Sequence, residues 1–265
     1  MNLTKKVLLA AWIFAALLLL VSGHFLSDDI VTEASMQAPS IQHWAGTDRL
    51  GRDVIVRTSR AAWHSAITVT LAEALGSSAA FFAASALAMS RRQRDTIIGK
   101  IILIALQAVP PLLIALTVSV LLRGVPGAIT FPLAVLSFTY GTPVFFGEIS
   151  SVRRLPQMQG ATILGAPFYW RLRKYWLPAI GPRLRTYILL DLISLVAYES
   201  LFGFFGLADP TVPSLGSMLA DSRPYVIQAP WLFIAPLGGV MLVLGAVWQI
   251  NLFMEARNEN AISSR

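Results

Sequence analysis

Three carboxylate residues lie inside long apolar stretches of the sequence, where ionisable side chains are unusual. They are Glu73, Asp191 and Glu199. A carboxylate at the centre of a membrane helix costs about 2.5–3.5 kcal/mol on insertion scales, so such a group normally faces protein or a water-filled path. Together the three residues predict either a proton or cation path, or a set of separate structural contacts.

Each of these carboxylates also has a structural interpretation. Asp191 lies one turn from the predicted cytoplasmic end of its apolar block, near Arg185. Glu73 could make a polar contact between helices, and for this residue we favour the structural role. The sequence alone leaves the transport role and the structural role open.

Several kinds of chemistry are missing from the chain. No cysteine occurs in its 265 residues, which excludes disulfides, thiolate zinc sites and thiol nucleophiles. The phosphate-binding pattern G-x4-G-K-[ST] is absent, because Gly99 and Lys100 are followed by Ile101, and Arg94 stands where the first glycine belongs. We therefore predict no catalytic residues and no nucleotide site in this chain.

The histidines are spaced unlike the ligands of any standard metal site. We predict no metal and interpret each as an isolated residue near a membrane edge: His24, His43 and His64.

The composition is that of an integral membrane protein. Hydrophobic residues make up 55% of the chain and charged residues 13%, whereas soluble domains carry about a quarter charged residues. The net charge of +7 does not indicate a nucleic-acid partner here, because in membrane proteins the distribution of Lys and Arg reports orientation.

Six apolar blocks are long enough to cross a hydrocarbon core of about 30 Å as helices. A cleavable signal peptide usually has an apolar region of 7–15 residues; the first block, which follows Lys5 and Lys6, is longer, so we expect it to be retained. The blocks are 7–26, 65–89, 97–122, 128–149, 187–207 and 231–253.

Six spans would place both termini on one side of the membrane. If that side is the cytoplasm, 15 of the 21 Lys and Arg residues lie inside and 6 outside, as the positive-inside rule requires. Segment 27–64 is then exterior, while the interval 150–182 is cytoplasmic.

The interval 150–182 has the pattern of a short amphipathic element. Its apolar residues recur at steps of three or four, the spacing of one helix face. Pro167 interrupts the run, so we expect two short helices joined by a bend. Such an element either lies on lipid headgroups or fits a groove on a soluble partner. It also carries basic residues and no acid: Arg153, Arg154, Arg171, Arg173 and Lys174.

The exterior segment contains the sequence GTDRLGRDV, which predicts a charged turn followed by an amphipathic entry helix. Local pairs between its charged residues would contribute little if exposed, about 0–1 kcal/mol each. This nine-residue sequence resembles a motif that follows the first span in binding-protein-dependent ABC importer permeases of the dipeptide, oligopeptide and nickel class. The residues that carry the resemblance are Gly46, Thr47, Asp48, Leu50, Gly51, Arg52 and Asp53.

The cytoplasmic interval resembles the coupling loop of the same family, E-A-A-x3-G-x9-I-x-L-P, in a degenerate form. Gln159 replaces the Glu of the motif, Gly160 replaces its first Ala, and Tyr175 replaces its Ile. A salt bridge made by the family's Glu would therefore be lost. The resemblance implies that this loop docks into an ATPase subunit through Gln159, Gly160, Ala161, Gly165, Leu177 and Pro178.

Weaker similarities extend to the end of the chain. YESLFGFFGL resembles the family's fifth-span ending, which implies that Glu199 packs between subunits or lines the passage. PSLGSML resembles an exterior motif in which Leu215 replaces a Trp, and Ala229 to Trp231 match the entry to the sixth span. The resemblance therefore covers about residues 43–257.

The resemblance implies an all-α integral membrane protein with six transmembrane helices, a permease core and cytoplasmic coupling helices. Its parts would be an N-terminal helix (1–26), the exterior segment (27–64), a five-helix core (65–257) that includes the coupling loop (150–182), and a cytoplasmic tail (258–265). Both termini would lie on the cytoplasmic side of a bacterial inner membrane.

The implied function is that of a permease subunit in an ABC importer. Its expected partners are membrane lipid, a second, homologous permease, two ATPases that bind ATP and Mg²⁺, and an extracytoplasmic solute-binding protein. The cargo would be peptides, or else nickel or a metal chelate. A proton-coupled carrier that uses Glu73, Asp191 and Glu199 is the main alternative, and an intramembrane enzyme is disfavoured.

Overall fold

The computed structural model describes residues 3–25, 35–89, 93–108, 110–125, 127–209 and 212–263. The chain is 79% helical, which confirms the all-α prediction. Its longer helices are α1 (Leu3–Phe25), α2 (Val54–Met89), α3 (Gln93–Ala108), α4 (Pro111–Leu121), α5 (Thr130–Arg153), α8 (Leu177–Phe204) and α10 (Trp231–Ser263). The short ones are α6 (Pro156–Ile163), α7 (Phe168–Arg171) and α9 (Leu215–Ser222).

Helix α2 is the centre of the bundle and packs against α1, α5, α8 and α10. It begins at Val54, so the last residues of the predicted exterior segment are already the first turns of this helix. The closest approach is to α5 at Gly76, where a Cβ atom would lie 2.5 Å from the carbonyl oxygen of Ala134 and 2.6 Å from Cβ of Ser137. The absence of a side chain at Gly76 therefore allows α2 and α5 to pack backbone to backbone.

Among the described residues, three helices are long and apolar enough to cross a membrane: Val54–Ala88, Tyr169–Phe204 and Trp231–Ala256. The described part of the chain also contains two shorter apolar helices, Ala10–Ser22 and Pro111–Leu121. The count of six spans therefore stays a prediction.

The third predicted block, 97–122, is not one continuous helix. Helix α3 ends at Ala108 and α4 begins at Pro111, with Pro110 at its N-cap. Two consecutive prolines remove two backbone donors and clash with the preceding turn, whereas proline is well tolerated at the start of a helix. The pair therefore ends one helix and begins another.

The predicted cytoplasmic interval also differs in part from expectation. Helix α6 is followed by a bend, as predicted, but α7 continues through a π-helical turn (Leu172–Trp176) directly into α8. Pro178 lies in the first turn of α8, where its missing N–H is tolerated. The second of the two expected short helices is therefore not separate, because it is continuous with α8.

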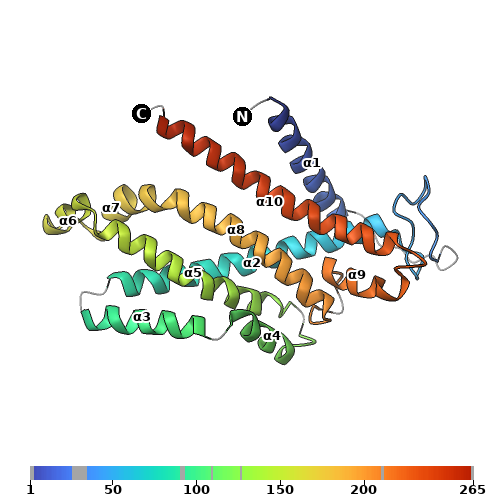
Figure 1. The fold of residues 1–265 in the computed structure, drawn as a ribbon, viewed down its shortest axis with the longest axis horizontal. Helices are drawn as coiled ribbons and strands as arrows, with labels where there is room; N and C mark the ends of the chain where they lie inside the picture. The colour runs from blue at the N-terminus through green and yellow to red at the C-terminus, as the bar shows by residue number, and fades with distance from the viewer. Residues whose placement is uncertain are drawn as a thin grey trace.

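The two segments with the strongest motifs lie at opposite ends of the bundle. The loop that precedes α2 and helix α9 are at the right of Figure 1, while α6 and α7 are at the left. The terminal ends of α1 and α10 lie on the same side of the molecule in this view (Figure 1). The long helices therefore connect two separate candidate docking ends.

Candidate functional site

The GTDRLGRDV sequence folds into a compact turn at the entrance to α2. Thr47 and Asp53 form an isolated antiparallel bridge, and the backbone N–H of Asp48 donates to the carbonyl of Arg52 at 2.9 Å. Gly51 has a φ of +75°, a left-handed conformation that side chains disfavour. Asp53 caps α2, because its Oδ1 accepts from the backbone N–H groups of Ile55 and Val56 at 2.8 and 3.2 Å.

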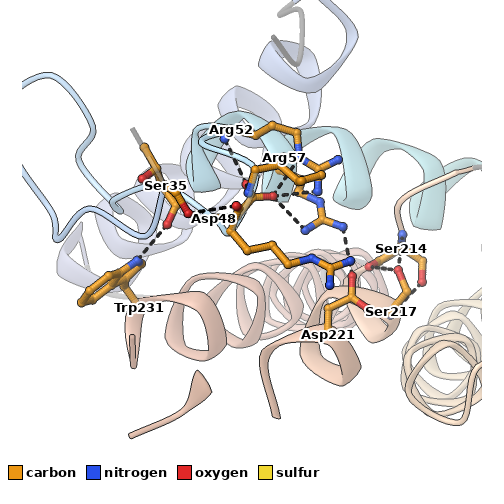
Figure 2. A network of polar contacts seen from close by, with 11 residues as sticks. Ser35, Asp48, Arg52, Arg57, Ser214, Ser217, Asp221 and Trp231 are labelled. Carbon is orange, nitrogen blue, oxygen red and sulfur yellow. Dashed lines mark hydrogen bonds and ion pairs between the residues drawn. The ribbon is translucent and has the colours of Figure 1, made fainter. Parts of the chain in front are cut away.

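Asp48 is the buried centre of this turn, with only 3% of its surface exposed. Its Oδ1 accepts from the backbone N–H groups of Leu50 and Arg52 at 2.8 and 3.0 Å. Its Oδ2 lies 2.7 Å from Arg52 Nη2 and 3.2 Å from Arg57 Nη1 (Figure 2). The expectation of weak exposed pairs was therefore wrong for Asp48, because the turn buries the carboxylate between two guanidinium groups.

Two further contacts tie the turn to distant parts of the chain. Arg57 donates through Nη2 to Asp221 Oδ2 of α9 at 3.1 Å (Figure 2). Trp231, at the start of α10, donates through Nε1 to the carbonyl of Thr47 at 3.2 Å. The three sequence motifs that we predict to be exterior, 46–54, 213–219 and 229–231, thus converge at one end of the bundle.

Arg57 and Asp221 belong to this network, although sequence analysis did not single them out. Arg57 lies nine residues after Asp48 and one turn of α2 beyond the motif. Its place on the helix that Asp53 caps was the feature of the sequence that could have linked it to Asp48. Asp221 is 164 residues from Arg57 in the sequence. No local pattern could have paired them.

Glu73 is buried where α2 meets α5. The hydroxyl of Ser77 donates to its Oε1, and the hydroxyl of Ser137 donates to its Oε2 at 2.8 Å. The carboxyl group of Asp191, on α8, adjoins that of Glu73. These contacts agree with a polar contact between helices and bring two of the three predicted carboxylates together.

The predicted position of Asp191, one turn from the end of its helix, was wrong. Asp191 is buried in the middle of α8, because that helix begins well before residue 187. Within the described part of the chain, Nη2 of Arg185 and Oδ2 of Asp191 both lack a hydrogen-bond partner.

Glu199 lies apart from this pair, in a cavity near the other end of α8 that His64 also lines. The three carboxylates therefore form two sites and not one path. His43 is not isolated, because its Nδ1 lies 2.9 Å from Asp53 Oδ2. The side chain of His24 lies outside the described residues.

The predicted coupling residues occupy the far end of the bundle. Gln159, Gly160 and Ala161 lie in α6, and Gly165 follows with a φ of +73°. A Cβ atom added to Gly165 would meet no neighbouring atom within 4 Å. The glycine therefore provides a bend and not a close approach. Gln159 makes a weak contact, with Nε2 3.4 Å from the carbonyl of Arg154.

One face of α6 is buried and the following bend is exposed. Met158 and Ala161 are 3% and 7% exposed and attach the helix to the bundle. Ile163 and Leu164 are 85% and 86% exposed. A groove of about 530 Å³ lies beside them and is lined by Ala88, Ser150, Arg153, Arg154, Gln159, Thr162 and Ile163.

Comparison with known proteins identifies the family. The probable peptide ABC transporter permease protein y4tQ of Sinorhizobium fredii is 30% identical over 223 residues, which cover 83% of this chain and 76% of that protein. The chain belongs to the ABC transporter permease family. A putative peptide permease protein of Brucella suis is 26% identical over 244 residues, which cover 91% of this permease and 80% of the Brucella protein.

Other relatives agree with this family. The dipeptide transport system permease protein DppC of Bacillus subtilis is 27% identical over 238 residues, which cover 87% of this permease and 74% of DppC. No family model matches the chain.

Solved structures show the same fold. A chain of the MetNI methionine ABC transporter, in an inward-facing conformation, superposes with a TM-score of 0.61 at 16% identity, covering 74% of this permease and 94% of that chain. A chain of an amino acid ABC transporter superposes with a TM-score of 0.58 at 13% identity, covering 76% of this permease and 94% of that chain. The permease is a multi-pass protein of the inner membrane.

Proposed function

We propose that this permease is one of two homologous membrane subunits of an ABC importer that takes up peptides. The observation that carries the proposal is its membership of the ABC permease family, together with exposed apolar residues at the end opposite the motif turn. Its named relatives include dipeptide, oligopeptide and D,D-dipeptide permeases. Two partner ATPases would bind ATP and Mg²⁺, and a solute-binding protein would deliver the cargo.

Coupling to the ATPases would use α6 and the bend that follows it. Ile163, Leu164 and Tyr169 are 85%, 86% and 70% exposed, and large apolar side chains in such a cluster favour a protein contact. Seating this short element in a groove of the ATPase would bury them. Closure of the ATPases on ATP would then move α6, and α8 would transmit the movement because α7 runs into it without a break.

Leu164→Asp is expected to remove most ATPase subunits from the purified transporter, because a carboxylate would replace an apolar side chain in the contact. Co-purification of the ATPases with the tagged permease measures the effect. Gln42→Asp is the matched control, since it adds the same charge to an exposed position at the opposite end of the bundle. Equal loss in both variants, or in neither, would argue against this docking site.

The motif turn would face the exterior and the solute-binding protein, with both termini in the cytoplasm. The chain has no cysteine, so single cysteines can report the side of each segment. We expect an impermeant thiol reagent to label Ser35→Cys in intact cells and to label Gln157→Cys only after the membrane is opened. Labelling of Gln157→Cys in intact cells would reverse the proposed orientation.

The nature of the cargo is tested by uptake. Cells that express the complete transporter should accumulate a labelled dipeptide or oligopeptide, and unlabelled peptide should compete. Accumulation of nickel or a nickel chelate without peptide uptake would replace the peptide proposal with metal import. A strain that lacks only this permease is the control, because it retains the binding protein.

A further inference from the structure

A polar cavity of about 150 Å³ lies between α2, α8 and the loops that follow α4 and α8. It is at the end of the bundle that carries the motif turn, and none of its lining residues belongs to that turn. The polar side chains that line it are those of His64, Ser65, Thr68, Glu199, Asp209 and Ser214. Its described lining therefore holds two carboxylates and no lysine or arginine.

Glu199 lacks the contacts that a buried carboxylate needs. It is 2% exposed, and its Oε2 has no hydrogen-bond partner among the described residues. The hydroxyls of Ser65 and Ser200 adjoin the carboxyl group, but neither is in hydrogen-bond geometry with another group in the described part of the chain. Of these three residues, Glu199 and Ser65 line the cavity itself.

A bound cation would satisfy this arrangement. A buried charge is costly unless it is paired and hydrogen-bonded, and none of the described side chains that line the cavity supplies a permanent positive charge. Asp209 adds a second carboxylate to the wall, and its Oδ2 accepts from the backbone N–H of Gly127 at 3.2 Å. The cavity is therefore built to attract positive charge.

We propose that this cavity binds a small monovalent cation, such as a primary ammonium group, with Glu199 as its counter-ion. An ammonium group has three N–H donors, which match the two oxygens of the Glu199 carboxylate and the hydroxyl of Ser65. The volume of about 150 Å³ accommodates an amino group.

Two sources could supply this cation. One is the N-terminal ammonium of a peptide cargo, and this part of the inference rests on the proposed function. The other is a free inorganic cation such as Na⁺ or K⁺, which would bind whatever the cargo is. In both cases the recognising chemistry is the same, so the test compares the two sources directly.

The test measures access to a single cysteine at Thr68 in the complete purified transporter. A neutral methanethiosulfonate reagent modifies Thr68→Cys, and mass spectrometry reports the modification on this chain. Methylammonium or Na⁺ at equal ionic strength is expected to slow the reaction at least fivefold. Adding Glu199→Gln should abolish this protection, whereas Glu148→Gln, a carboxylate change at a distant position of α5, should leave it unchanged.

Protection by methylammonium alone would indicate an amine from the cargo, and protection by Na⁺ would indicate an inorganic ion. No protection, or equal protection with and without Glu199, would overturn the proposal. If Thr68→Cys does not react, the thermal midpoint of the purified transporter is measured instead. The same cations should raise the midpoint of the wild type and leave that of Glu199→Gln unchanged. Peptide uptake by the same preparation separates the two proposals, since protection without peptide uptake keeps the cavity and removes the peptide cargo.

Discussion

Gly165→Leu is expected to lower ATP-driven uptake more than tenfold while the permease remains inserted in the membrane. Gly165 has a φ of +73°, and a residue with a side chain pays about 1–2 kcal/mol to adopt this left-handed conformation. The bend would relax and change the direction of α6, which carries the exposed Ile163 away from its ATPase contact. Uptake, ATP hydrolysis and subunit co-purification measure the effect.

Two matched variants show whether the backbone conformation is responsible. Gly160→Ala introduces a side chain at a glycine of α6 that also has open space around it, but there the conformation is helical, so uptake should be retained. Gln159→Ala removes a single weak contact, worth at most about 1.5 kcal/mol, and should cost no more than about tenfold. If the Gly165→Leu transporter shows normal uptake and the Gln159→Ala transporter shows none, the coupling element lies elsewhere.

Asp48→Asn is expected to destabilise the permease by about 3 kcal/mol. Loss of the charge leaves Arg52 and Arg57 without their common partner, and removal of one member of a buried pair typically costs about 3–5 kcal/mol. The lower end applies, because these arginine side chains retain 19% and 15% exposure. The thermal midpoint of the purified permease should fall by several degrees.

Arg49→Ala is the control for Asp48→Asn. Arg49 belongs to the same turn, but it is exposed, so its loss should change stability by less than about 0.5 kcal/mol. Equal midpoints for the Asp48→Asn variant and the wild type would show that the turn does not anchor α2 to α9.

Local patterns predicted the elements that depend on neighbouring residues. The bend after α6 followed from Pro167, and the turn before α2 followed from the GTDRLGRDV sequence. Glu73 was expected to contact polar groups of another helix, and it contacts Ser137 of α5.

Contacts between distant segments could not be predicted in the same way. The Arg57–Asp221 pair and the Trp231–Thr47 hydrogen bond span 164 and 184 residues, and they form only because α2, α9 and α10 meet at one end of the bundle. The hydropathy of block 97–122 does not reveal its break, and Pro110 and Pro111 by themselves predict a kink but not two separate helices. Asp191 was misplaced because the helix that contains it continues through Pro178 and Pro182.

Uptake by the complete transporter in proteoliposomes is the most direct test of whether this permease works in an ABC importer. The cargo and its binding protein are supplied at the face of the motif turn, and ATP at the face of α6, without a proton gradient. We expect accumulation that requires ATP and persists in the presence of a protonophore. Accumulation that needs no ATP and stops when the proton gradient is dissipated would contradict this function and favour a proton-coupled carrier.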